Sequence, residues 1–431
     1  MTAPIEIDTS SVDLADFPLS DIEMWAGGAG GRAAAFKKLR DEAPITFFPE
    51  TPIEGFPPGP GFWSLTRFDD IMHVSRHPEL FCSGQGTNIP DLPIEISEFY
   101  GSMINMDAPR HTRLRRIVSK SFTPRMVARI DEDVHVKARG VLAAVADKGE
   151  CDFVAEIASV LPLQIICEMM GIPRESWTRI MELTNVILGG GDPELTPDFG
   201  TLLNASLEMA AIAQAVGEDR LANPQDDLVS ALMHASVDGE SLTPPEMASF
   251  FILLAAAGNE TTRNAISHGT WALHNDRAQW NAWAADPDTL SPTAVEEIVR
   301  WATPVIHFRR TATENTEISG VKIAEGDKVV MWYEAGNRDE LHFDDPYRFD
   351  IARTPNDHIG FGAGGPHFCL GANLARREIR VMFEEIFQWL PDLRITTPPD
   401  YLQSPFIHGI KRMRCEFTPT DVPLLPDAPA T

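Results

Sequence analysis

The sequence has few cysteines and few basic residues. Its 431 residues include only five cysteines, and no two of them form a CxxC pair. This argues against a zinc knuckle and a disulfide framework, and it fits a reducing compartment. Asp and Glu number 63 against 36 Lys and Arg, which gives a formal net charge of −27. Such acidity argues against duplex nucleic acid as the main partner, because phosphate binding needs a basic surface.

Targeting and membrane-spanning segments are also missing. Residues 1–24 contain six acids and no Lys or Arg, whereas a signal peptide begins with basic residues. The longest uncharged apolar stretch, residues 247–258, has twelve residues and is too short to span a bilayer. These features predict a cytoplasmic protein without a membrane anchor.

The pattern along the chain predicts one mainly helical domain over residues 1–431. We expect an irregular segment at 1–30 and a Pro-rich tail at 417–431. A 3.6-residue period dominates from about residue 110 to 300, strand-like runs lie within 305–335, and 337–368 is a long irregular stretch. A helix is predicted from about Gly371 to Trp389. A long loop inside a compact domain is usually functional.

A glycine-rich loop precedes Cys369. Four glycines lie within Gly360–Gly365, and such a loop lets the backbone approach a flat or bulky group. Cys369 stands just before the predicted helix, where backbone N–H groups and the helix dipole favour a thiolate. A thiolate held by backbone donors suits a soft metal, whereas the alternative is a buried structural cysteine. The loop also matches the G-x-G-x-x-G dinucleotide fingerprint, but no predicted strand precedes it.

A long predicted helix is interrupted by polar residues in its middle. Thr243 and Glu246 match a capping box with Pro244 at the first helical position, and the apolar run predicts about thirty residues of helix. Gly258 in that run costs up to ~1 kcal/mol relative to Ala, and burying Glu260 carries a desolvation cost. Because a helix-interior glycine and a charged residue in an apolar run both occur here, we predict a functional site at this point of the helix. The alternative is that the helix reaches solvent at this point.

A third feature is the pair Glu297 and Arg300, which share one face of a predicted helix. Taken alone, such a pair is usually exposed and contributes little to stability.

These three features, in this order and near this spacing, resemble the marks of the cytochrome P450 family. The matching elements are the cysteine loop, the A-G-x-E-T-T sequence of the oxygen helix and the E-x-x-R pair. Residues 106–116 resemble the family's proximal-side helix and 344–350 its meander. Residues 257–268 and 360–380 are most similar to an actinobacterial, mycobacterial-type group that hydroxylates methyl-branched lipids and sterol side chains. The resemblance implies the P450 fold, with haem b between the oxygen helix and the helix after the cysteine loop.

By position, the resemblance implies roles for four residues at the reacting centre. Cys369 is implied as the axial thiolate of the haem iron, which favours O–O cleavage. Glu260 and Thr261 are implied as the pair that delivers protons during oxygen activation. Ala257, one turn before Thr261, is implied to face the haem and, with Gly258, to leave room for dioxygen.

Further residues are implied to hold the haem and the fold around it. The implied partners of the haem propionates are His111, Arg115, Arg310 and His367. Phe361 and Gly371 are implied parts of the haem-binding loop, although Phe361 stands eight residues before Cys369, one more than is usual in the family. The implied structural triad behind the haem is Glu297, Arg300 and Arg348. In such a buried network, losing one member costs ~3–5 kcal/mol.

Candidate substrate-pocket residues follow from the family topology and are almost all aliphatic. They are Ile89, Ile94, Ile104, Val186, Ile187, Leu188, Leu253, Val305, Ile306, Phe406 and Ile407. Such a pocket would hold a long apolar substrate by area burial, worth ~25 cal/mol per Å². We therefore expect a methyl-branched fatty acid, an isoprenoid or a sterol side chain, oxidised at or near the chain end. The alternative for each residue is a place in the hydrophobic core.

Electrons are expected from another protein, because the chain carries no flavin or iron–sulfur motif. Residues 108–130 contain seven Lys or Arg and no acid, and three arginines follow Cys369. We expect an acidic ferredoxin, served by an NAD(P)H-dependent reductase, to bind at Arg113, Arg116, Lys120, Arg376, Arg377 and Arg380. The alternative is a solvated helix face.

Three other readings of the same sequence stay open. A peroxide-driven hydroxylase needs no proton relay, so the intact Glu260 and Thr261 argue against it. A non-catalytic haem-thiolate sensor or lipid carrier would bind lipid without turnover. A helical scaffold protein with a structural cysteine would bind no haem at all.

Overall fold

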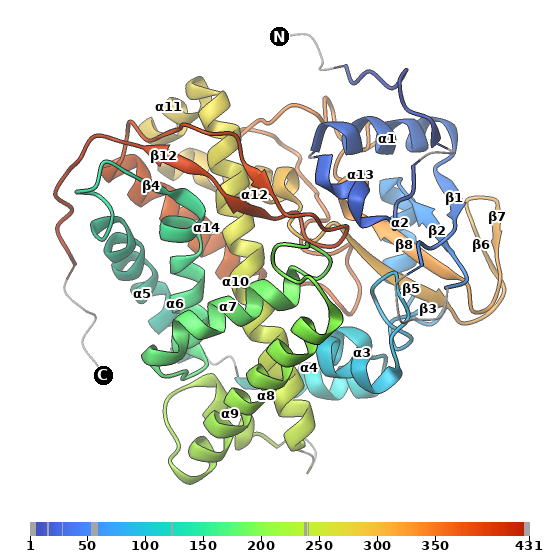
Figure 1. The fold of residues 1–431 in the computed structure, drawn as a ribbon, viewed down its shortest axis with the longest axis horizontal. Coiled ribbons are helices and arrows are strands. Elements are labelled where there is room, and N and C mark those ends of the chain that lie inside the picture. The colour runs from blue at the N-terminus through green and yellow to red at the C-terminus, as the bar shows by residue number, and fades with distance from the viewer. Residues whose placement is uncertain are drawn as a thin grey trace.

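The computed structural model describes residues 6–14, 17–27, 29–52, 59–121, 124–236, 239 and 241–425. A large helical part packs against a smaller part that contains the main sheet. Figure 1 shows this sheet at one side of the molecule, together with the N-terminal helix α1 (Ala29–Glu42). The arrangement is the predicted one, a mainly helical fold with small sheets. None of the described helices is both long and apolar enough to cross a membrane.

Helix α10 (Pro244–Asn275) runs through the helical part and has 32 residues. It begins at the predicted capping box, in which the Glu246 N–H donates to the Thr243 hydroxyl at 3.3 Å and the Thr243 N–H donates to the Glu246 carboxylate at 3.0 Å. Its neighbours are α6 (Val160–Met169), α7 (Trp177–Leu188), α8 (Phe199–Ala222) and α12 (Pro287–Ala302). Contact with helices on several sides explains why α10 is buried on several faces rather than on one, polar residues included.

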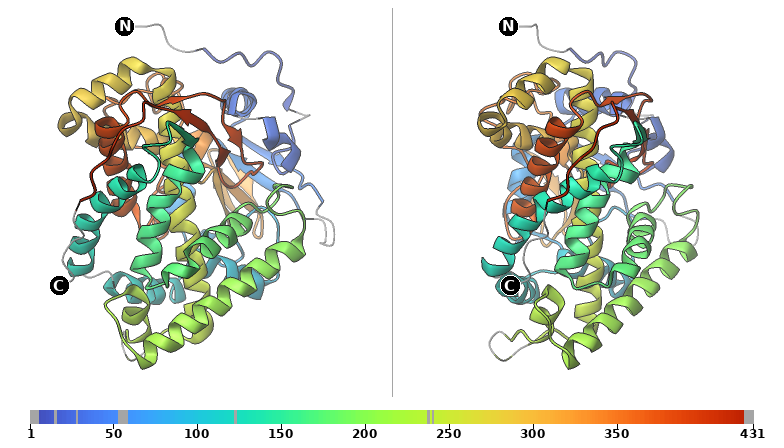
Figure 2. Two further views of the ribbon diagram at one scale, coloured as in Figure 1. Left: turned by 60° about the vertical axis from the view of Figure 1, so that its left-hand side comes forward. Right: turned by 90° about the vertical axis from the view of Figure 1, so that its left-hand side faces the viewer.

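The other helices are α2 (Phe68–Arg76), α3 (Ile94–Gly101), α4 (Arg110–Ser121), α5 (Pro124–Ala143), α9 (Leu228–Met233), α11 (Arg277–Ala285), α13 (Tyr333–Gly336) and α14 (Ala372–Trp389). They either pack around α10, as α3, α11 and α14 do, or lie elsewhere, as α2 and α13 do beside the main sheet. The bounds of α14 agree with the helix predicted after the cysteine loop. Helices α14 and α10 are in contact, which brings the cysteine loop beside the oxygen helix. Figure 2 shows α8, in light green, along the outer side of the helical part.

The main sheet has five strands in the order β1-β2-β8-β5-β3. Their bounds are β1 Ile45–Phe48, β2 Phe62–Leu65, β3 Phe81–Cys82, β5 His307–Ala312 and β8 Lys328–Trp332. Strands β2 and β8 are parallel, and the other pairs are antiparallel. Strands β5 and β8 are the runs predicted within 305–335, and the hairpin β6 (Thr316–Ile318) and β7 (Val321–Ile323) lies between them.

Two smaller sheets lie outside the main sheet. Strands β4 (Glu150–Asp152), β12 (Arg414–Glu416) and β9 (Arg394–Ile395) form one, and β10 (Asp400–Tyr401) pairs with β11 (Ile410–Arg412). Residues 417–425 of the expected Pro-rich tail contain no helix or strand.

The expectation of an irregular segment over residues 1–30 was wrong for its second half. A 3-10 helix spans Ile22–Gly27, and α1 begins at Ala29. Its order depends on a distant contact, because the buried Trp25 stacks on Trp332 of β8 with ring centroids 5.5 Å apart. The Trp25 indole also donates to the Leu19 carbonyl at 3.1 Å. The sequence could not predict this order, because the stacking of Trp25 on Trp332 joins residues far apart in the chain and leaves no local periodic pattern.

Candidate active site

The cysteine loop doubles back on itself before α14. Gly362, Gly364 and Gly365 have φ values of 98°, 78° and 77°, which L side chains rarely adopt. A Cβ at Gly365 would also lie 2.3 Å from the Ser75 carbonyl oxygen of α2. The Cys369 N–H donates to the carbonyl of Phe361 at 3.0 Å and so closes the loop. The glycines are therefore needed for two reasons: the turn requires positive φ values, and the loop passes too close to α2 for a side chain at Gly365.

The thiol of Cys369 faces an internal cavity, so the residue is buried within the fold yet accessible to a small molecule. Burial raises the pKa of the Cys369 thiol, whereas the Gly371 N–H and the guanidinium groups of Arg115 and Arg376 lower it. Burial thus outweighs the helix-end effect that the sequence predicted. A cation bound at the sulfur is what would convert this thiol to a thiolate.

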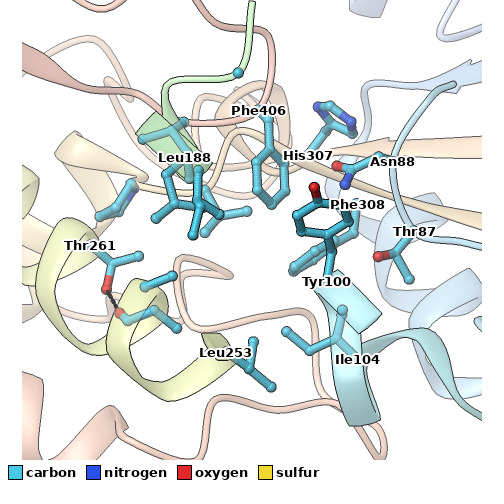
Figure 3. Close-up of a pocket in the computed structure, with 18 of the residues that line it drawn as sticks. Thr87, Asn88, Tyr100, Ile104, Leu188, Leu253, Thr261, His307, Phe308 and Phe406 are labelled. Carbon is cyan, nitrogen blue, oxygen red and sulfur yellow. Dashed lines mark hydrogen bonds between the residues drawn. The ribbon is translucent and has the colours of Figure 1, made fainter. Parts of the chain in front are cut away.

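Helix α10 forms the opposite wall of the same cavity. The Thr261 hydroxyl donates to the Ala257 carbonyl at 2.8 Å, dashed in Figure 3, and both residues line the cavity. Gly258 lines the cavity as well, but a Cβ there would lie 2.9 Å from Ile166 of α6. Gly258 therefore also permits close packing of α6 on α10, in addition to leaving space at the wall.

Glu260 lies on another face of α10 and does not line the cavity. Its side chain is buried and pairs with Arg263, one turn further along the helix. Burial raises the pKa of the Glu260 carboxyl, and the neighbouring Arg263 opposes that shift. Arg263 in turn donates to the Asn185 amide oxygen of α7 at 2.7 Å. The two residues predicted as a pair are thus adjacent in sequence, but only Thr261 reaches the cavity.

One part of the cavity wall carries positive charge without a matching acid. His111, Arg115, Arg310 and His367 all line it, and the His111 and His367 rings lie 4.2 Å apart. Within the described chain no carboxylate pairs with Arg115 or Arg310; these donate to the carbonyls of Phe368 at 2.6 Å and Arg309 at 2.8 Å. The buried His111 Nε2 has no hydrogen-bond partner among the described residues. Burial and the nearby Arg310 lower the pKa of His367 to about 2.

This wall fits a flat, dianionic cofactor. A cation without a counter-ion in a protein wall is costly, so the partly buried Arg115, the buried Arg310 and the orphaned imidazole of His111 call for an anion. Haem offers two propionates at one edge of a planar ring and an iron that takes a cysteine sulfur. Cys369, the basic wall and the small residues of α10 all line one cavity of about 1060 Å³.

The network behind the site differs from the predicted triad in one member. Arg300 donates to both carboxylate oxygens of Glu297 at 2.7 Å, and both side chains are fully buried. The third member is Arg353, which reaches Glu297 at 3.1 Å. The predicted Arg348 is placed differently: its guanidinium pairs with Asp345 at 2.6 Å, and its backbone carbonyl accepts from Arg300 at 3.1 Å.

Most of the predicted substrate-pocket residues line the cavity. These are Ile89, Ile104, Ile187, Leu188, Leu253, Val305, Phe406 and Ile407, several of which are labelled in Figure 3. Val186 and Ile306 do not line the cavity: Val186, on α7, is partly buried against the hydrophobic core, and Ile306 belongs to the core around Trp25 and Trp332. The side chain of Ile94 lies outside the described residues.

The cavity also has lining residues that the sequence did not single out. Among them are Thr87, Asn88, Tyr100, His307 and Phe308 (Figure 3). The pocket is therefore more aromatic and more polar than the aliphatic set implied. Strand-like alternation around residues 305–310 could have pointed to His307, but nothing local marks Tyr100, which reaches the cavity from α3.

A cysteine loop facing a central helix across a cavity with an unpaired basic wall defines a haem-thiolate site. The cytochrome P450 family profile matches residues 289–399. The methyl-branched lipid omega-hydroxylase of Mycobacterium tuberculosis (strain ATCC 25618 / H37Rv) is 52% identical over 405 residues, covering 93% of this chain and 95% of that protein. The steroid C26-monooxygenase of Rhodococcus jostii (strain RHA1) is 41% identical over 389 residues, covering 89% of this chain and 81% of that protein.

A solved structure is similar over nearly the whole chain. It is a cytochrome P450 of Mycobacterium marinum in complex with pseudoionone, which matches with a TM-score of 0.89 and 42% identity, covering 95% of this chain and 100% of that one. The chain belongs to the cytochrome P450 family. It is a P450 monooxygenase that uses haem b, binds lipophilic substrates and takes electrons from redox partners. The predicted fold, enzyme class and cofactor are confirmed.

Proposed function

We propose that this P450 hydroxylates a long hydrophobic lipid at or near its chain end, with dioxygen and electrons from a ferredoxin. The candidate substrates are a methyl-branched fatty acid, an isoprenoid and a sterol side chain. The observation that carries the proposal is one continuous cavity in which aliphatic and aromatic side chains lead to Thr261 and Cys369. The names of the relatives given above support the same substrate class.

The haem would be held by residues of three segments. Cys369 would bind the iron, with Phe361 and Gly371 in the loop beside it and Ala257 opposite. Arg115 and Arg310, with His111 and His367, would meet the propionates, which removes the desolvation problem of that wall. Thiolate-bound haem activates dioxygen and transfers one oxygen atom to a C–H bond.

Proton supply falls to α10. Thr261 lines the cavity and can hold a proton near the reacting oxygen, because its hydroxyl is both donor and acceptor. Glu260, next in sequence, would supply protons to this hydroxyl from the buried polar cluster beside the cavity. Burial raises the pKa of its carboxyl, which favours the protonated form that a proton donor needs.

The ferredoxin would bind the basic face formed by α4 and the start of α14. Intramolecular pairs reduce its charge, because Arg113 pairs with Glu246, Arg376 with Glu296, and Arg380 with Glu384. Arg116 and Arg377 complete the described part of this face, and the side chain of Lys120 lies outside the described residues. The pairs are partly exposed, so an acidic partner can still compete for these arginines.

The test starts from purified, haem-loaded protein. Fatty acids, isoprenoids and sterols are screened for a low-to-high-spin shift, and those that bind are incubated with ferredoxin, reductase and NAD(P)H. We expect a product that carries one added oxygen atom near the chain end, identified by mass spectrometry. Product formed only with hydrogen peroxide would indicate a peroxygenase, and binding without any product would indicate a sensor. A reduced, carbon-monoxide-bound spectrum without the thiolate-type Soret band would overturn the haem-thiolate assignment.

A further inference from the structure

Positive charge is confined to one part of the cavity wall. Of all the described residues that line the cavity, Arg115 and Arg310 are the only Lys or Arg, and both belong to the basic wall proposed for the haem. Four segments that form much of the remaining wall, residues 84–109, 180–219, 244–262 and 395–409, contain no Lys or Arg. Among the residues whose side chains the structure does not describe, the only Lys or Arg are Lys120, Arg125 and Arg129, all within residues 120–132.

The mouth of the cavity carries carboxylates instead. Lining residues reach the surface at Pro52, Gly190, Asp198 and Phe199, and Asp21 also lines this region. The segments meet there, because a Cβ on Gly191 would lie 2.7 Å from the Ile22 side chain.

Two of these carboxylates lack a basic partner within the described chain. Asp198 caps α8 and accepts from the Thr201 N–H at 2.7 Å, and this bonding lowers the pKa of its carboxyl. Asp21 accepts from the Glu23 N–H at 2.9 Å. A third lining acid, Glu50, differs because Lys328 neutralises it at 2.6 Å. The entrance is therefore negative in net charge.

We propose that this mouth selects lipids whose head group is uncharged, such as an alcohol, a ketone or an ester, over the carboxylate of a free fatty acid. The inference rests on the proposed function, in which the chain end lies near Thr261 and the head group near the mouth. A carboxylate at the mouth would lose hydration without gaining a cation and would face Asp198 and Asp21. A neutral head loses less hydration and can use hydroxyl and amide groups such as those of Thr51 and Asn88, which line the same region.

The experiment compares ligands that differ only in the head group. The probes are 3,7,11-trimethyldodecanol, the corresponding carboxylic acid and its methyl ester, each titrated into the haem-loaded protein at pH 7.5 and followed by the spin-state shift. We expect the dissociation constant of the acid to exceed those of the alcohol and the ester by ~tenfold or more. An acid that binds as tightly as the ester would overturn the inference while leaving the proposed function intact. Failure of all three, together with the sterols and isoprenoids of the screen, would count against the proposed function.

Variants separate the mouth from the overall charge of the protein. Asp21→Asn and Asp198→Asn together remove two negative charges, and Asn at 198 remains a good N-cap for α8. The control is Glu218→Gln with Asp219→Asn, which removes two charges near the other end of α8, away from the cavity lining. We expect the gap between acid and ester to shrink several-fold in the mouth variant and to stay unchanged in the control. Equal shrinkage in both would assign the effect to net charge and overturn the role of the mouth.

Discussion

Glu260 and Arg263 form an ion pair one turn apart on α10, and both side chains are almost fully buried. Arg263 also donates to Asn185 of α7, so the pair links the oxygen helix to a helix whose end lines the substrate cavity. The second carboxylate oxygen of Glu260 has no hydrogen-bond partner among the described residues. The carboxylate proposed for proton supply is thus held beside the cavity rather than in its wall.

We expect this pair to be energetically coupled. Arg263→Gln leaves a buried carboxylate without its cation and should lower the free energy of unfolding by ~3 kcal/mol. Glu260→Gln removes the charge that needs the cation, so the double variant should lose less than the sum of the two single variants. Urea unfolding of the four proteins measures the difference. Strictly additive losses would contradict a pair that forms in solution.

Thr261→Ala should uncouple oxygen consumption from product formation. The variant removes the hydroxyl that lines the cavity beside Ala257, so electrons continue to be used while fewer turnovers end in hydroxylated lipid. We expect the yield of product per NAD(P)H to fall by ~tenfold, with substrate affinity little changed. Thr270→Ala is the control, because Thr270 is a buried threonine of the same helix that does not line the cavity. An equal loss of yield in both variants would remove the special role of Thr261.

Substitution of Arg353 and of Arg348, which lie in one loop behind the site, should lower the free energy of unfolding by different amounts. Arg353 reaches the fully buried Glu297, so Arg353→Met should lower the free energy of unfolding by ~3 kcal/mol. Arg348 pairs with Asp345 at a partly exposed position, so Arg348→Met should cost ~1 kcal/mol or less. Urea unfolding at neutral pH measures both. A larger cost at Arg348 would show that the predicted triad, rather than the observed network, carries the stability.

This comparison also shows which parts of the site the sequence could predict. The capping box at Thr243 and the loop before Cys369 depend on residues close together in the chain, so spacing alone predicted them. The choice between Arg348 and Arg353 depends on how a long irregular stretch folds back onto α12, and no periodic pattern encodes that path.

The residues that line the cavity also include some that the sequence suggested and some that it did not. Leu253 and Ala257, which the family topology suggested, lie one turn apart on one face of α10, and both line the cavity. Tyr100 and Asn88 were missed because no pattern in the sequence marks them. Tyr100 reaches the cavity from the short helix α3, and Asn88 reaches it from an irregular region before α3. Ile306 directly precedes β5, and the sequence does not show on which side of the sheet it lies; its packing with Trp25 and Trp332 places it in the core.

The proposed ferredoxin surface predicts an effect of charge reversal on reduction. Arg116→Glu should lower the rate of electron transfer from an acidic ferredoxin by ~tenfold at low salt, and the difference should shrink at high salt because ions screen the attraction. The control is Arg179→Glu on α7, an exposed arginine that pairs with Glu182 and Glu208. Stopped-flow reduction under carbon monoxide measures the rates. Unchanged kinetics for Arg116→Glu would remove this face as the docking site.

His307 predicts a specific loss of stability on acidification. It is buried between Trp332 and Phe406, and burial lowers the pKa of its imidazole to about 4 although its Nδ1 bonds the Pro405 carbonyl. In the unfolded chain the imidazole has its ordinary pKa of 6.5, so between pH 6.5 and 4 it binds a proton that it does not bind in the folded protein. Stability from this group is therefore complete above pH 6.5 and is lost as the pH falls towards 4, by about 2 kcal/mol at pH 5.

The variant His307→Phe isolates this contribution, because it keeps an aromatic ring against Trp332 but cannot bind a proton. We expect the free energy of unfolding of the wild-type protein to fall between pH 7.5 and pH 5 by about 2 kcal/mol more than that of the variant. His234→Gln, at an exposed position, controls for the loss of a histidine. Urea unfolding at several pH values, followed by circular dichroism, measures the slopes. Parallel slopes for the wild type and His307→Phe would mean that the imidazole at 307 is protonated in the folded protein, and that its site is more polar than the packing around Trp332 implies.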